Sequence, residues 1–118
     1  MREGGKMNGE QERRKYVRVP FSAGLTITSI SGQQTCSGNS INLSRGGIGL
    51  YCEKFFPTGT RLMIQVEMHY KGKVIKDQLS GTVRWAKIEQ DGAILGVEFD
   101  ELLNPTKNHD LCNVLDSK

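Results

Sequence analysis

The feature that most constrains the fold of this chain is an alternation of apolar and polar residues with a period of two. The clearest run places Leu62, Ile64, Val66 and Met68 on one side, with Met63, Gln65, Glu67 and His69 between them. Successive side chains of a strand point to opposite faces of a sheet, so this run predicts a half-buried β-strand.

Shorter runs of the same kind predict several more strands. They cover residues 23–28, 36–42, 48–52, 79–85 and 95–99. Turns are predicted at 31–34, 44–47, 57–60, 71–73 and 90–92, where glycine, proline or an Asp-Gly pair interrupts the alternation. We therefore expect an all-β fold, a small split-barrel type of antiparallel β-barrel with six to seven strands. Barrel closure also removes exposed sheet edges.

The two ends of the chain do not follow the alternation. Residues 1–12 are polar and glycine-rich, so we expect a flexible tail before a single barrel domain over residues 13–103. Asn104 and Pro105 offer a helix cap followed by proline in the first turn. Leu111, Val114 and Leu115 have helical spacing, which predicts a short C-terminal helix over residues 104–118 that covers one end of the barrel.

The net charge of +3 is concentrated at the N-terminus. The first 18 residues hold six Lys or Arg and three Glu, of 16 and 13 in the chain, so the remaining residues carry ten of each sign. Such a basic arm indicates an anionic partner. The three cysteines and two histidines lack metal-site spacing, so we expect free thiols, no metal and no cofactor. No apolar run suits a membrane helix or a secretion signal, which predicts a cytoplasmic protein without membrane insertion.

Two short segments carry residues suited to bind a nucleotide. The first holds Arg13, Arg14 and Arg18, with Arg14 and Arg18 in RxxxR spacing. Guanidinium groups bind phosphate and the guanine edge through paired hydrogen bonds, although a solvated basic terminus would look similar. The second segment is the string from Asn42 to Gly47, NLSRGG. Its Asn and Ser can bond a base edge, and we expect its two glycines to turn with positive φ and admit a ligand; the alternative is a purely structural turn.

The order of these segments resembles the PilZ domain family. RxxxR is followed roughly 25 residues later by [D/N]xSxxG, here with Asn42 in the first position. Residues 81–85 (GTVRW) resemble the GxVxW strand of the family, and residues 96–99 (GVEF) resemble its G[IV]xF strand. The resemblance spans residues 13–101, so nearly the whole predicted domain is covered.

The resemblance implies a PilZ-like barrel that binds cyclic di-GMP, a bacterial second messenger. By analogy, the ligand-binding residues would be Arg13, Arg14, Arg18, Asn42, Ser44, Gly46 and Gly47. Family members with arginine at the position of Arg13 tend to bind two intercalated nucleotides, so two molecules per chain are expected. Without an output domain in the sequence, we expect the signal to pass to a separate, unidentified partner protein.

Other functions fit parts of the sequence. A PilZ-like adaptor that binds no nucleotide would share the fold, although such members usually lack one of the two motifs. RNA or single-stranded DNA is not expected as a partner, because the barrel body carries no net charge and few aromatic residues. No nucleophile–base pair or phosphate loop can be read, so no enzyme activity is expected.

Three more residues near the motifs carry expectations. Trp85 lies on an alternating strand, which predicts a core position in preference to a surface platform for a base. Arg45 could point to ligand or to solvent, and Tyr16 could pack on the barrel or on the ligand.

Overall fold

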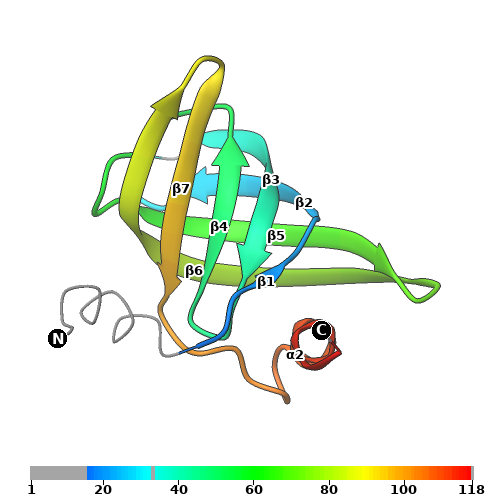
Figure 1. Cartoon of the computed structure of the whole chain (residues 1–118). Coiled ribbons are helices and arrows are strands. Elements are labelled where there is room, and N and C mark those ends of the chain that lie inside the picture. Colours follow the sequence, from blue (N-terminus) through cyan, green and yellow to red (C-terminus); the bar gives the residue numbers. More distant parts are fainter. Residues whose placement is uncertain (1–15, 33, 118) are drawn as a thin grey trace, which may run out of the picture.

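Strands make up most of the described chain, which comprises residues 16–32 and 34–117 of the computed structural model (Figure 1). The strands are β1 (Val19–Pro20), β2 (Gly24–Ser29), β3 (Thr35–Leu43), β4 (Gly47–Cys52), β5 (Arg61–Tyr70), β6 (Lys73–Glu89) and β7 (Gly92–Phe99). One helix, α2 (His109–Asp116), follows them within the described residues. The tail predicted for residues 1–12 lies outside the described residues.

The sheet is antiparallel throughout and closes into a barrel. Its strand order is β1-β3-β2-β5-β6-β7-β4, and an additional pairing between β3 and β4 joins the two sides. Six strands therefore form the closed barrel, and the short β1 is an extra strand paired with β3. The predicted fold, an antiparallel barrel of six to seven strands with a C-terminal helix, is confirmed.

The period of two produces this barrel because each of the six barrel strands buries residues of one face in the interior. In β5 the side chains of Leu62, Ile64 and Val66 are almost completely buried, while Gln65 and Glu67, which alternate with them, are exposed. Together with inward residues of the other strands they form one apolar core. Burial of apolar surface is the main favourable term in folding, so this pattern determines which face of each strand points inward.

A buried serine joins β3 to the segment before β2. The Oγ atom of Ser40 donates a hydrogen bond to the carbonyl oxygen of Phe21 at 2.7 Å. It also accepts one from the N–H of Ala23 at 2.8 Å. Both backbone groups lie where the chain enters the barrel, so this hydroxyl satisfies polar groups that burial would otherwise leave without partners.

The predicted core position of Trp85 is wrong. The pairing of β6 with β7 shifts between Val83 and Trp85, which is a β-bulge. A bulge adds one residue to one strand, so the alternation of inward and outward side chains changes phase. Arg84 and Trp85 are consequently both exposed, and Trp85 keeps 45% of its surface accessible.

The helix also begins later than predicted. The side-chain oxygen of Asn104 accepts hydrogen bonds from the N–H groups of Thr106 (2.7 Å) and Lys107 (3.2 Å), and this closes a turn before the helix. The helix itself starts at His109. Its buried residues, which include Leu111 and Val114, join the apolar core of the barrel. With eight residues, α2 is too short to cross a membrane, and no described helix is long and apolar enough to do so.

Candidate functional site

The fold brings one residue of each motif together at β1. Pro20 pairs with Asn42 across β1 and β3, so Arg18, two residues before Pro20, comes close to Asn42. The Nη1 atom of Arg18 lies 3.5 Å from Oδ1 of Asn42, which is a long contact between exposed side chains. Arg13 and Arg14 lie outside the described residues, so their participation stays a prediction.

The orientation of Asn42 is determined by its neighbour on β4. The backbone N–H of Gly49 donates a hydrogen bond to Oδ1 of Asn42 at 3.1 Å. Because an N–H group needs an acceptor, this contact assigns the oxygen to the inner position and leaves the NH₂ group outward. Within the described part of the chain that NH₂ group makes no hydrogen bond, so both of its donors are available to a ligand.

Ser44 builds the turn of the second motif. Its N–H donates to the carbonyl oxygen of Gly47 at 2.9 Å, and its Oγ accepts a hydrogen bond from the N–H of Gly46 at 3.2 Å. The side chain is buried, with 7% of its surface exposed. In this structure Ser44 therefore stabilises the turn that presents the neighbouring residues.

The two glycines of the turn do not have the positive φ that we expected. Among the described glycines, only Gly59 and Gly72 have positive φ. Gly47 is required by close packing, because a Cβ atom there would lie 2.5 Å from the carbonyl oxygen of Val97 on β7. Gly46 leaves room for an aromatic ring, because its Cβ would lie 3.3 Å from the ring of Tyr16.

Tyr16 and Arg45 both pack on the protein. The ring of Tyr16 lies over Gly46, so one of the three residues between the motif arginines contacts the second motif directly. The side chain of Arg45 reaches the carbonyl oxygen of Leu103 at 3.4 Å, and the N–H of Leu103 donates to the carbonyl oxygen of Arg45 at 2.8 Å. These contacts fasten the turn to the segment that leads to α2.

A half-exposed indole lies in the same row of the barrel surface as Asn42. The row runs across four strands, with Asn42 paired to Gly49, Gly49 to Gly96, and Gly96 to Trp85. A Cβ atom on Gly96 would lie 2.0 Å from Nε1 of Trp85, so the indole rests directly on the glycine backbone. The two glycines thus allow the Asn42 amide and the Trp85 ring to lie against the sheet.

Sequence reasoning missed Trp85 as a residue of this surface. The alternation pattern cannot reveal the bulge that turns it outward, because a bulge depends on how β6 pairs with β7. A usable signal was nevertheless present. Gly96 stands in an apolar strand, and glycine there often marks a close approach of another group.

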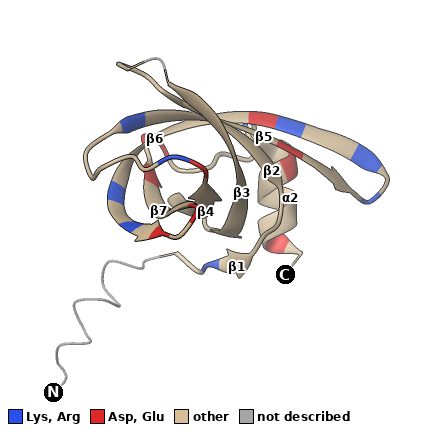
Figure 2. Cartoon of the chain, turned by 90° about the horizontal axis from the view of Figure 1, so that it is seen from above, with Lys and Arg blue, Asp and Glu red and all other residues tan. Residues whose placement is uncertain are grey.

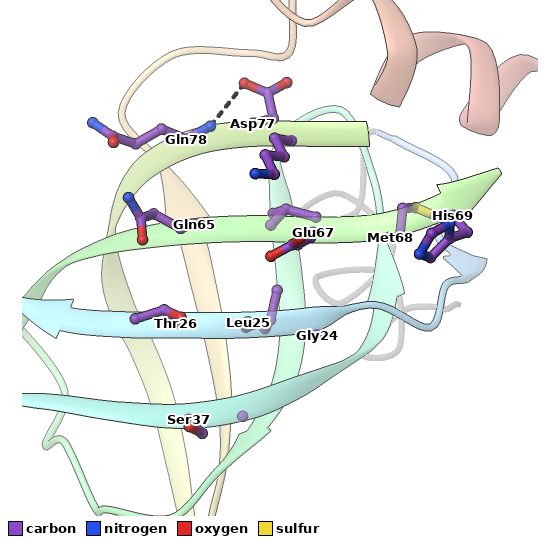
Figure 3. Close-up of a pocket in the computed structure, with 13 residues that line it drawn as sticks. Gly24, Leu25, Thr26, Ser37, Gln65, Glu67, Met68, His69, Asp77 and Gln78 are labelled. Atoms are coloured by element: carbon purple, nitrogen blue, oxygen red, sulfur yellow. Dashed lines mark hydrogen bonds between the residues drawn. The ribbon is translucent and has the colours of Figure 1, made fainter. Parts of the chain in front are cut away.

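A hollow of the described surface lies elsewhere. It measures about 840 Å³ and is lined by residues of β2, β3, β5 and β6, among them Thr26, Gln65, Glu67 and Asp77 (Figure 3). None of the predicted ligand residues lines it. Because none of the motif residues borders this hollow, we take the surface around Arg18, Asn42 and Trp85 as the candidate site.

The cysteines do not offer reactive groups. All three are buried and free, and Sγ of Cys52 donates a hydrogen bond to the carbonyl oxygen of Lys54 at 2.8 Å. Burial raises the pKa of Cys52 to about 12, and burial also raises the pKa of Cys112. A protonated thiol is a poor nucleophile. The described residues also contain no group of three His, Cys, Asp or Glu that could hold a metal ion.

Comparison with known proteins gives one family. The sequence profile of the PilZ domain family matches residues 12–114. No curated protein sequence matches the chain.

Several solved structures share the fold. The PilZ domain of YcgR from Escherichia coli, solved with c-di-GMP, is 21% identical with a TM-score of 0.65, and the match covers 89% of this chain and 90% of that one. The Bacillus subtilis inhibitor of motility MotI/DgrA is 18% identical with a TM-score of 0.68, covering 90% of this chain and only 53% of that one. The PilZ domain of CeSA from a cellulose-synthesizing bacterium is 14% identical with a TM-score of 0.53, covering 86% and 96%.

Proposed function

Because this chain belongs to the PilZ domain family, we propose that it is a receptor for cyclic di-GMP that passes the signal to a separate protein. The observation that carries the proposal is the pairing of β1 with β3, which places Arg18 of the first motif beside Asn42 of the second. The similar PilZ domain of YcgR, which was solved with c-di-GMP, supports the choice of ligand.

Arg18, Asn42 and Trp85 each have a distinct part in the proposed binding. The guanidinium of Arg18 bonds a phosphate or the O6/N7 edge of a guanine, because both are paired acceptors. The outward NH₂ group of Asn42 donates to the same nucleotide. The half-exposed indole of Trp85 stacks against a base, a contact that any purine face can make.

The arginine arm completes the site in this proposal. Arg13 and Arg14 precede Tyr16, the first described residue, whose ring lies on Gly46 of the second motif. Two cyclic di-GMP molecules bring four phosphates together, and their mutual repulsion must be offset by cations. We assign that role to Arg13, in addition to Arg14 and Arg18, and propose two nucleotides per chain. The protein would then act in the bacterial cytoplasm, where the messenger is made.

Isothermal titration with cyclic di-GMP tests the proposal. We expect saturable binding with two nucleotides per chain, and Arg18→Ala or Arg14→Ala should weaken it by roughly 10- to 150-fold, the loss of one charge-assisted contact of about 1.5–3 kcal/mol. The matched control is Lys107→Ala, which removes an exposed cation that is paired with Glu101 and belongs to neither motif.

The titration also separates the alternatives. One nucleotide per chain would keep the receptor and contradict the role of Arg13. No binding at tens of micromolar would favour the adaptor that shares the fold but recognises only a protein. Steeply salt-dependent binding of oligonucleotides in place of cyclic di-GMP would indicate a nucleic-acid partner.

A further inference from the structure

One part of the barrel has an open strand edge. β6 pairs with β5 from Lys73 to Thr82, but on its other side it pairs with β7 only from Gly81 onward. Within the described part of the chain, residues 73–80 therefore have a strand neighbour on one side only. This section belongs to the β5–β6 hairpin, which projects beyond the rest of the barrel (Figure 1).

Two hydrogen bonds show which backbone groups point to the open side. The N–H of Gln78 donates a hydrogen bond to Oδ1 of Asp77 at 2.8 Å. The carbonyl oxygen of Ser80 accepts a hydrogen bond from the N–H of Asp100 at 2.9 Å. Neither partner belongs to β5, so Gln78 and Ser80 direct their backbone groups away from β5. Alternate residues of a strand bond to the same side, so Val74 and Lys76 do likewise.

The backbone groups of Val74 and Lys76 are not used on that side. Among the described residues, no hydrogen bond from the open side reaches the N–H or C=O of either residue. At one end of the edge, the carbonyl oxygen of Ser80 is already bonded to the N–H of Asp100, and the N–H of Gln78 is bonded to Oδ1 of Asp77. The stretch with unused backbone groups is therefore short.

The edge lacks most of the features that prevent strand addition. The β5–β6 ladder runs without a register shift, and the bulge of β6 lies farther along, between Val83 and Trp85. None of the three prolines of the chain falls in β6. The side chain of Val74 is 48% exposed, which adds an apolar contact next to the open backbone groups. Regular edges of this kind, without a bulge or a proline, can accept an added strand.

The charge of the hairpin indicates which strand the edge accepts. Basic residues outnumber acidic ones at its projecting end (Figure 2), because residues 70–78 hold Lys71, Lys73 and Lys76 against a single acidic residue, Asp77. Lys73 is bonded to Asp110, whereas Lys76 has no ion pair among the described residues, although it lies opposite Glu67 in the β5–β6 ladder. A second copy paired edge to edge would bring its own lysines to this edge, and like charges oppose such pairing.

We propose that residues 74–78 of β6 bind an extended acidic segment of a partner protein, which joins the sheet as an additional strand. Backbone hydrogen bonds to Val74 and Lys76 hold the segment, and its carboxylates face Lys76. This edge is the docking surface for a partner, and its use does not depend on nucleotide binding at Arg18 and Asn42.

The decisive variant is Lys76→Pro. Proline removes the N–H that points to the open side, while the bonds between β6 and β5 remain, so the barrel should keep its fold. The matched control is Lys76→Ala, which removes the same charge and keeps the N–H. The probe is a capped seven-residue peptide that alternates valine and glutamate, compared with a peptide in which lysine replaces glutamate.

We expect the acidic peptide to bind the wild type saturably and to slow amide exchange at Val74 and Lys76, measured by NMR. Lys76→Pro should weaken binding at least tenfold, Lys76→Ala by about fivefold or less, and the basic peptide should not bind. Circular dichroism confirms the fold of each variant.

Three results would overturn the inference. They are an absence of acidic-peptide binding at millimolar concentration, equal binding by folded Lys76→Pro, and slowed exchange at residues other than those of the edge. Concentration-dependent dimerisation that Lys76→Pro abolishes would assign the edge to a second copy and reject the acidic partner. Lys76→Pro should leave the affinity for cyclic di-GMP unchanged. A titration with cyclic di-GMP therefore tests the nucleotide site independently of the strand edge.

Discussion

Replacing Gly96 by alanine should remove Trp85 from the proposed site without altering Trp85 itself. A Cβ atom at position 96 would lie 2.0 Å from Nε1 and 2.3 Å from Cε2 of the indole. Non-bonded carbon atoms prefer separations of about 3.5–4.0 Å, so the ring must move by at least roughly 1.5 Å. The Cβ cannot move instead, because it is attached to the strand backbone.

The size of the effect follows from what the ring contributes. Stacking of a base on an aromatic side chain is worth about 1–3 kcal/mol, so Gly96→Ala should weaken cyclic di-GMP binding by roughly 5- to 150-fold. The expected loss in the free energy of unfolding is smaller than the total free energy of unfolding of a typical domain. The indole is already 45% exposed, so its displacement returns on the order of 100 Å² to water, at most about 2.5 kcal/mol against 5–15 kcal/mol for a typical domain.

Intrinsic fluorescence gives a direct assay, because Trp85 is the only tryptophan of the chain. Cyclic di-GMP should change the emission of the wild type on binding, and Gly96→Ala should shift the emission of the free protein to that of a more exposed indole. Titration calorimetry then gives the affinity. The control is Gly24→Ala on β2, where the added Cβ would be 3.7 Å from the carbonyl oxygen of Glu67, an ordinary contact.

Two outcomes would refute this reasoning. If Gly96→Ala binds cyclic di-GMP as tightly as the wild type while Trp85→Ala does not, the glycine does not position the indole. If both variants bind normally, the indole is not part of the site, and recognition must depend on Arg18, Asn42 and the preceding arginines.

Two further predictions concern the core. Ser40→Ala should lower the free energy of unfolding by about 1–3 kcal/mol in urea, because the N–H of Ala23 and the carbonyl oxygen of Phe21 lose their side-chain partner; the exposed Ser37→Ala on the same strand should change little, and equal losses would contradict the argument. Burial raises the pKa of Cys52 from 9.0 to about 12, so folding favours the protonated thiol. This contribution is complete below pH 9 and is lost between pH 9 and 12, by up to about 1.4 kcal/mol per pH unit, and Cys52→Ala should flatten the decline in urea unfolding measured across that range.

Much of the fold could be predicted because burial acts on each strand separately. The alternation around Leu62, Ile64 and Val66 indicates an inner face whatever the neighbouring strand is. The start of the helix was harder to predict. The side chain of Asn104 bonds the N–H groups of Thr106 and Lys107 and closes a separate turn, so the helix begins only at His109.

The site was predictable in its residue types and not in its geometry. The motifs containing Arg18 and Asn42 are readable, but the reasons for the glycines are not. Gly47 accommodates the backbone of β7, and Gly96 accommodates the ring of Trp85. Both reasons lie in residues of other strands, so local sequence could suggest only a turn with positive φ.

By itself, the sequence determined the β-barrel class, the strand pattern and the two motifs that identify the family. Those features depend on the period of apolar residues and on side-chain chemistry, which are properties of short segments. The tertiary structure alone decided that Arg18 lies beside Asn42, that Trp85 faces outward and that β6 keeps an open edge. Each of these follows from the register between strands, because one bulge reverses the faces of a strand and one pairing joins residues far apart in the chain.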